Sequence, residues 1–185
     1  ALMLVCWTAV YNFSLAFGDS VKIVVMPKGN AVQAVLYDKT KGMVFDMGSK
    51  GKLNSGMESF LELYGIKELK GAFIESEQYY TITKYNEQMT IRPDRFYING
   101  EPDNDSELPF ITGAQLDWNG VKIEALEDGY KTTTEGCVVT IEKGSVTING
   151  RNLDTTDEEY PLMIDMKNSQ IRRTDYGFAY GFGSW

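Results

Sequence analysis

The chain has 185 residues, a formal net charge of −8 and no histidine. This length accommodates one domain with a substantial core. The lack of histidine excludes the usual Ser–His and Cys–His catalytic groups and the usual histidine-containing zinc sites. The acidic charge disfavours direct binding to a nucleic-acid backbone, and the two cysteines, Cys6 and Cys137, are too few for a disulfide framework.

Residues 1–17 form a run without a charged side chain, which ends at Gly18 and Asp19. A helix that crosses a bilayer needs ~20 predominantly apolar residues, so the run predicts the end of a transmembrane helix whose first part lies upstream. A signal peptide would carry a basic start, which this run lacks. A buried core strand or helix is the remaining alternative. The membrane interpretation makes the membrane a partner and places the globular domain, residues 18–185, on the extracytoplasmic side.

Three short apolar runs follow, at residues 21–25, 31–37 and 43–46, joined by glycine-containing connections. Such a pattern is typical of an antiparallel meander. Ser55 and Glu58 have the spacing of a capping box, and the apolar positions of residues 55–64 share one helical face. Gly65 is a suitable stop. We therefore expect a helix over 55–64 that packs on the meander, followed by a strand over 71–74.

The second half is rich in hairpin signals. Asn119-Gly120 separates strands predicted at 114–118 and 121–126, and Lys143-Gly144 separates 138–142 from 145–148. Asn99-Gly100 and Asn149-Gly150 mark further turns, and residues 160–166 resemble a strand. Aromatic residues alternate with small ones over 176–183, which favours a strand with one bulky face; it fits core packing or an aromatic binding surface.

Carboxylates are the remaining candidates for cation chemistry. Asp103, Asp105 and Glu107 alternate within one acidic segment, and oxygen ligands suit calcium. The spacing is similar to the start of an EF-hand loop, but the glycine of its sixth position is missing. A solvated acidic loop is the simpler interpretation, and the same holds for the acids of residues 154–159.

The segment Val21–Gly48 resembles the opening of metallo-β-lactamase-like domains, and in particular the domain that follows the membrane helices of ComEC-type competence proteins, which import DNA. In that family the first strand ends in a pattern like D-V-G-Q-G-D, where this chain keeps Gly29 and has Asn30 in place of the aspartate. The third strand ends in a pattern like L-I-D-x-G, which Asp46 and Gly48 match. The resemblance implies a mixed, sheet-rich α/β fold, namely an αββα sandwich with reduced helices, preceded by the end of a transmembrane helix.

The metal-binding motif of the family is absent. Where the family reads H-x-H-x-D-H after the fourth strand, this chain reads Glu75-Ser76-Glu77-Gln78-Tyr79-Tyr80. A later strand of the family ends in G-D, whose aspartate bridges two metals, and here Gly150 is followed by Arg151. An arginine would repel a cation. The resemblance thus predicts no catalytic residue, metal or cofactor, and gives Gly29, Asn30, Asp46, Gly48 and Gly150 structural roles, with Asp46 accepting backbone amides in its turn.

Three functions remain open. The leading hypothesis is a non-catalytic metallo-β-lactamase-like domain of a bacterial competence-type membrane protein involved in DNA uptake, with the rest of a membrane channel as partner and no direct contact with DNA. The alternative is a binding or structural module of a cell-envelope protein, with no enzymatic activity. The third is an enzyme that uses carboxylates alone with magnesium or calcium.

Overall fold

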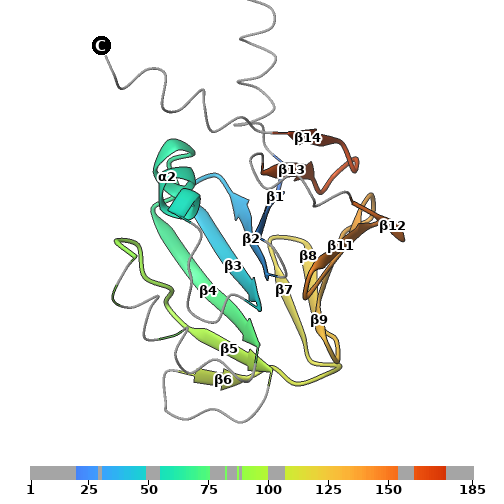
Figure 1. The fold of residues 1–185 in the computed structure, drawn as a ribbon, viewed down its shortest axis with the longest axis horizontal. Coiled ribbons are helices and arrows are strands. Elements are labelled where there is room, and N and C mark those ends of the chain that lie inside the picture. Colours follow the sequence, from blue (N-terminus) through green and yellow to red (C-terminus); the bar gives the residue numbers. More distant parts are fainter. Residues whose placement is uncertain are drawn as a thin grey trace, which may run out of the picture.

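The structure is a computed structural model that describes residues 20–28, 31–48, 55–75, 82, 87, 89–99, 107–153 and 161–173. These residues form two β-sheets that pack face to face, with a helix on the outer side of the first sheet (Figure 1). The mixed, sheet-rich α/β class predicted from the sequence is therefore confirmed. The predicted helix over 1–17 and the aromatic tail over 176–183 lie outside the described residues.

The first sheet has eight strands in the order β14-β13-β1-β2-β3-β4-β5-β6. Strands β14 to β3 are antiparallel neighbours, and β3 to β6 are parallel. The change of direction occurs where helix α2 (Ser55–Leu63) connects β3 to β4, because parallel neighbours need a crossover connection. The strands are β1 (Lys22–Lys28), β2 (Ala31–Asp38), β3 (Lys41–Met47), β4 (Glu68–Glu75), β5 (Phe96–Asn99), β6 (Glu107–Pro109), β13 (Leu162–Asp165) and β14 (Ile171–Arg173).

The second sheet has six strands in the order β12-β11-β10-β9-β8-β7, all antiparallel. Asn119 and Gly120 have positive φ angles of 52° and 76°, as a type I′ hairpin turn requires, so this predicted turn is confirmed. The strands are β7 (Gln115–Trp118), β8 (Val121–Ala125), β9 (Gly129–Thr133), β10 (Val138–Glu142), β11 (Ser145–Ile148) and β12 (Arg151–Asn152). Strand β9 was not predicted from the sequence.

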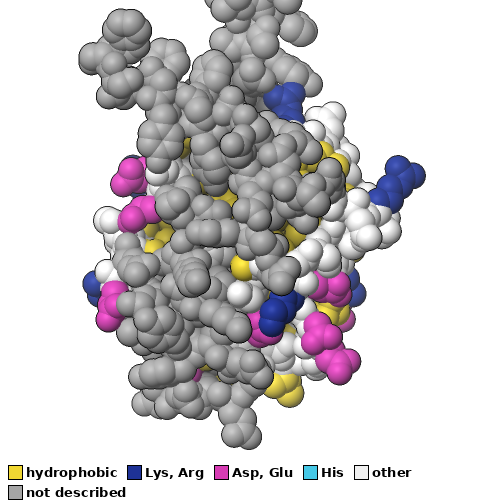
Figure 2. Space-filling model, viewed as in Figure 1, with side chains coloured by type: hydrophobic (Ala, Val, Ile, Leu, Met, Phe, Trp, Pro, Cys, Tyr) yellow, Lys and Arg dark blue, Asp and Glu magenta, His cyan; other side chains and the backbone are white. Residues whose placement is uncertain are grey.

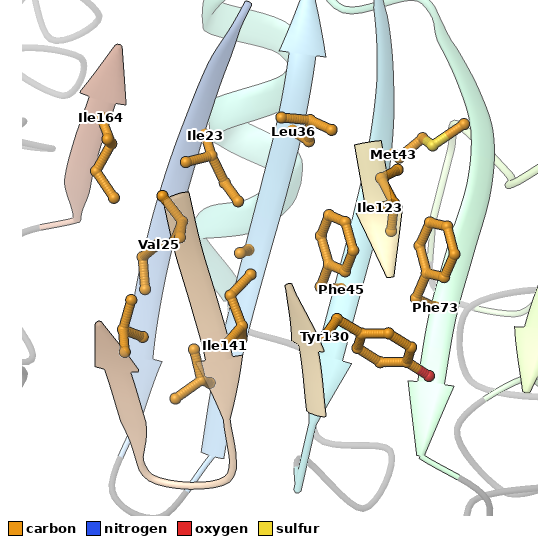
Figure 3. Close-up of a cluster of buried hydrophobic side chains, with 14 of the residues drawn as sticks. Ile23, Val25, Leu36, Met43, Phe45, Phe73, Ile123, Tyr130, Ile141 and Ile164 are labelled. Carbon is orange, nitrogen blue, oxygen red and sulfur yellow. The ribbon is translucent and has the colours of Figure 1, made fainter. Parts of the chain in front are cut away.

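The main core fills the space between the two sheets (Figure 3). The rings of Phe45 and Phe73 stack with their centroids 4.8 Å apart, and the ring of Tyr130 reaches them from the second sheet. Alternate residues of the first sheet, such as Val44, point the other way and pack on the apolar face of α2, where Phe60 lies. This alternation follows from the period of a strand, which places successive side chains on opposite faces. The packing of α2 on the meander confirms the sequence prediction.

The sandwich has two ends, the loop end and the turn end. The loop end is where β3, β4 and β5 finish and comprises residues 48, 75, 99, 126–129 and 142–145. The turn end is the opposite end and comprises Ser20 and residues 38–41, 64–68, 119–120, 134–136, 149–151 and 166–169. Hydrogen bonds between the sheets fix these positions: Asn99 Nδ2 donates to the carbonyl of Leu126 at the loop end, and Asn119 Nδ2 donates to Asp38 Oδ2 at the turn end.

The outer face of the second sheet carries polar side chains, including the ion pair between Lys131 and Glu124 at 2.7 Å. Within the described part of the chain no helix covers this face, so the four-layer αββα arrangement stays a prediction. No helix among the described residues combines the length and the apolar character that crossing a membrane needs.

Candidate functional site at the loop end

Asp46 is fully buried near the end of β3, on the sheet face that packs against α2. Its Oδ2 accepts a 2.9 Å hydrogen bond from Nε2 of Gln33, its direct neighbour on β2. Gln33 is itself only 3% exposed. A buried carboxylate is stable when hydrogen bonds compensate its lost hydration, and the Gln33 amide supplies one of them. The backbone-amide role predicted for Asp46 stays a prediction.

Gly48 follows β3 with a φ angle of 79°, which glycine adopts without strain. Its amide donates a 3.1 Å hydrogen bond to Oε2 of Glu75, the last residue of β4. The other oxygen of the same carboxylate lies 3.8 Å from the ammonium of Lys143, which projects from the β10–β11 turn of the second sheet. Glu75 thus joins the turn after β3 to the second sheet.

Tyr130 crosses the core from β9, and its hydroxyl donates a 2.9 Å hydrogen bond to the carbonyl of Ile74. Burial of the ring raises the pKa of Tyr130 well above its ordinary value, and the nearby negative charges of Glu75 and Asp46 add to the shift. The hydroxyl therefore stays protonated and remains a donor at physiological pH. Figure 3 shows the ring beside Phe45 and Phe73, with the hydroxyl directed toward β4.

Asn99, at the end of β5, completes the connections between the sheets at this end. Its Nδ2 donates to the carbonyls of Leu126 and Glu127, at 3.1 and 3.3 Å, in the β8–β9 turn. At the loop end, the Asp46 carboxylate is therefore buried beside the Gln33 amide, and the Glu75 carboxylate is partly buried beside the Lys143 ammonium. The third group is the protonated phenol of Tyr130. Each of these groups has a partner within the protein, and the described contacts stabilise the ends of β3, β4 and β5.

The positions predicted from the family resemblance do not all meet at this site. Asp46 and Gly48 lie here, whereas Gly29 and Asn30 lie outside the described residues. Gly150 lies at the turn end, where the adjacent Asn149 accepts from the amide of Val138 and donates to Ser169. The resemblance implies that the position after Gly150 and the segment that begins at Glu75 form one metal site, and the structure places Arg151 and Glu75 at opposite ends of the sheets.

Each hairpin of the second sheet reverses the direction of the chain. Strand β10 therefore runs toward the loop end, and β11 returns toward the turn end, where Arg151 is exposed.

The cation-binding candidates receive no further support from the described residues. Glu107 is 3% exposed in β6, and Asp103 and Asp105 lie outside the described residues, as do residues 76–80 and 154–159. In the described ranges no three His, Cys, Asp or Glu side chains gather in a way that could hold a metal ion.

Three members of the site were not predicted from the sequence. Gln33 could have been found from the sequence, because it is a polar residue within an apolar run. No sequence pattern indicates Tyr130 and Lys143, because their roles depend on how the second sheet packs against the first. No protein-family model matches this chain, and no curated protein matches it.

Proposed function

We propose that this chain is a non-catalytic, metallo-β-lactamase-like domain of a competence-type membrane protein, with a structural or binding role in DNA uptake. The order of the first elements supports the proposal: three antiparallel strands, then α2, then a parallel strand. Asp46 and Gly48 stand at the end of the third strand, as the L-I-D-x-G pattern of that family requires.

The observation that carries the non-catalytic part is the contact between Lys143 and Glu75. Glu75 begins the segment that replaces the metal-binding motif, and its carboxylate lies 3.8 Å from the Lys143 ammonium. A metal ion beside this carboxylate would be repelled by the ammonium. The second oxygen of Glu75 already accepts the Gly48 amide, so the carboxylate serves as a connection within the fold.

The apolar run at residues 1–17 supports attachment to a membrane, with the domain on the extracytoplasmic side. The acidic charge of the chain supports a role near the transported DNA in which this domain does not bind DNA directly.

A second candidate is a binding or structural module of a cell-envelope protein unrelated to competence. The position of Gly150 favours it, because the family pattern expects that residue beside the motif after β4 and the structure places it at the turn end. A sequence upstream with several further membrane helices would favour the competence-type role, and a single anchor would favour this alternative.

The test is genetic, in the organism that encodes the chain. Removal of residues 20–173 should lower the uptake of labelled DNA, whereas Glu75→Gln and Asp46→Asn should leave uptake unchanged in cells that hold the normal amount of folded protein. Unchanged uptake after the deletion would remove the competence role and leave the second candidate. Loss of uptake in Glu75→Gln, with normal protein level, would refute the non-catalytic role.

A further inference from the structure

Three Asn-Gly pairs occur in the chain, at residues 99–100, 119–120 and 149–150. An asparagine followed by glycine is prone to deamidation, because glycine has no side chain to obstruct the attack of its own backbone nitrogen on the asparagine amide. The structure describes both members of two of these pairs, Asn119-Gly120 and Asn149-Gly150, and all four residues are exposed to water. The surroundings of these two pairs can therefore be compared.

The two pairs occupy turns of the same kind. Each forms the two-residue loop of a hairpin, β7–β8 in one case and β11–β12 in the other. The φ angles are 52° and 76° for Asn119 and Gly120, and 49° and 76° for Asn149 and Gly150. The groups that contact the two asparagine side chains, and not the type of turn, therefore distinguish the pairs.

The Asn119-Gly120 pair contacts two carboxylates. The Gly120 amide donates a 3.3 Å hydrogen bond to Oδ1 of Asp117. Nδ2 of Asn119 donates a 3.0 Å hydrogen bond to Oδ2 of Asp38. Deamidation requires the Gly120 nitrogen to lose its proton as it attacks Cγ of Asn119, and the Asp117 carboxylate lies beside that proton as a base. The Asp38 carboxylate lies beside the nitrogen that departs, where its negative charge favours a protonated leaving group.

The Asn149-Gly150 pair has different surroundings. Oδ1 of Asn149 accepts a 2.8 Å hydrogen bond from the Val138 amide, and Nδ2 donates a 2.9 Å hydrogen bond to Oγ of Ser169. Neutral groups thus hold both ends of this amide and oppose the rotation that would bring its carbon toward the Gly150 nitrogen. No carboxylate in the described ranges accepts a hydrogen bond from the Gly150 amide.

We propose that Asn119 is a site of spontaneous deamidation, with water as the only other reactant, and that the change weakens the attachment between the two sheets at the turn end. The Gly120 nitrogen bonds to Cγ of Asn119, the Cγ–Nδ2 bond breaks, and ammonia leaves with the proton that Gly120 releases. Water then opens the cyclic imide and leaves aspartate or isoaspartate at position 119. A neutral hydrogen-bond donor is thereby replaced by a carboxylate.

The new carboxylate would face Asp38, whose Oδ2 lies 3.0 Å from the departing nitrogen. Two carboxylates this close repel each other, so the contact that attaches the β7–β8 turn to the β2–β3 turn would become repulsive. On the face shown in Figure 2, acidic side chains gather over the lower ends of β8 and β9, at the loop end. The β7–β8 turn lies at the other end, and the added charge would therefore act first on its neighbour Asp38.

Incubation of the full chain at neutral pH, followed by peptide mass spectrometry, tests the site. In the folded chain Asn119 should gain the mass of deamidation several-fold faster than Asn149, and in concentrated urea the two rates should become similar. Asp117→Asn should slow the reaction at Asn119 in the folded chain and leave the rate at Asn149 unchanged. Equal rates at the two sites of the folded chain, or a slower rate at Asn119, would overturn the proposal.

An exchange of the two side chains tests the consequence. Asn119→Asp should lower the midpoint of thermal unfolding, and the further change Asp38→Asn should restore it, because the amide and the carboxylate have then exchanged places. Asn152→Asp adds the same charge at an exposed position of the edge strand β12, and this control should have a smaller effect. Equal losses in Asn119→Asp and Asn152→Asp, or no recovery with Asp38→Asn, would refute the weakened attachment.

Discussion

The hydroxyl of Tyr130 on β9 donates a 2.9 Å hydrogen bond to the carbonyl of Ile74 on β4, across the interface between the two sheets. This bond connects the second sheet to the strand end that carries Glu75. Because Tyr130 is fully buried, no bulk water replaces the bond when it is removed.

Tyr130→Phe keeps the ring and removes the bond, so we expect unfolding free energy to fall by roughly 0.5–1.5 kcal/mol, the usual net value of such a bond. Chemical denaturation measured by circular dichroism would give the value. Tyr97→Phe is the matched control, since the half-buried Tyr97 ring stacks on Phe73 at 4.7 Å and its hydroxyl makes no hydrogen bond with any residue that the structure describes. Equal losses in the two variants would contradict the role of the Tyr130 hydroxyl.

Gly136 lies at the turn end, where a Cβ atom would overlap the carbonyl oxygen of Lys167. Backbone atoms cannot move aside as a flexible side chain can, so Gly136→Ala should destabilise the fold by roughly 3 kcal/mol or more, as other overpacked sites do. Gly120→Ala should cost only about 1–2 kcal/mol, because its φ of 76° is strained for alanine but its Cβ would meet nothing within 4 Å. Thermal unfolding of both variants shows which of them is destabilised more. A larger loss of stability in Gly120→Ala than in Gly136→Ala would show that the two turns are placed differently.

The hydrogen bond between Gln33 and Asp46 couples two buried side chains of neighbouring strands. A double-mutant cycle with Gln33→Ala and Asp46→Ala should give a coupling free energy of about 1.5–3 kcal/mol, because the acceptor is a carboxylate. The Lys131–Glu124 pair on the outer face is the control and should give less than about 1 kcal/mol, since it is partly exposed. A coupling near zero for Gln33 and Asp46 would refute their pairing.

Glu58 on α2 accepts a 2.7 Å hydrogen bond from the amide of Thr90, where the capping-box pattern predicts a bond to an amide of its own helix. The bonds to Thr90 hold the pKa of the Glu58 carboxyl below its ordinary value. A carboxyl whose pKa is lower in the folded state adds stability above its unfolded pKa and loses that contribution as pH falls through the folded pKa. Glu58→Gln should therefore lower stability at pH 7 and flatten its decline below about pH 4.5.

Denaturation midpoints measured from pH 2 to 7 would test this effect. The control is Glu62→Gln, an exposed change at the other end of the same helix. Its denaturation midpoint should depend on pH as steeply as that of the parent chain. Parallel curves for the parent and Glu58→Gln would count against the bond to Thr90.

The meander and helix α2 were predictable because their signals are local: apolar runs separated by glycine turns, and a helical apolar face that begins at Ser55. Strand β9 was not, because Tyr130 is its only large apolar residue. Its pairing depends on the core that Tyr130 fills between the sheets. The contact of Glu75 with Lys143 was not predictable either, because it joins two sheets and no local sequence pattern indicates how those sheets are placed relative to each other. The place of Gly150 at the turn end was not predicted from the sequence, because it depends on how many strands precede it in the second sheet.

The absence of hydrolytic activity is the central claim, and metal content together with phosphodiester hydrolysis tests it most directly. The full chain, purified and dialysed against zinc or manganese, should retain far less than one metal ion per molecule and should hydrolyse bis(p-nitrophenyl) phosphate no faster than buffer. Stoichiometric metal with hydrolysis that Glu75→Gln abolishes, but that Glu142→Gln at the same end leaves intact, would contradict the claim.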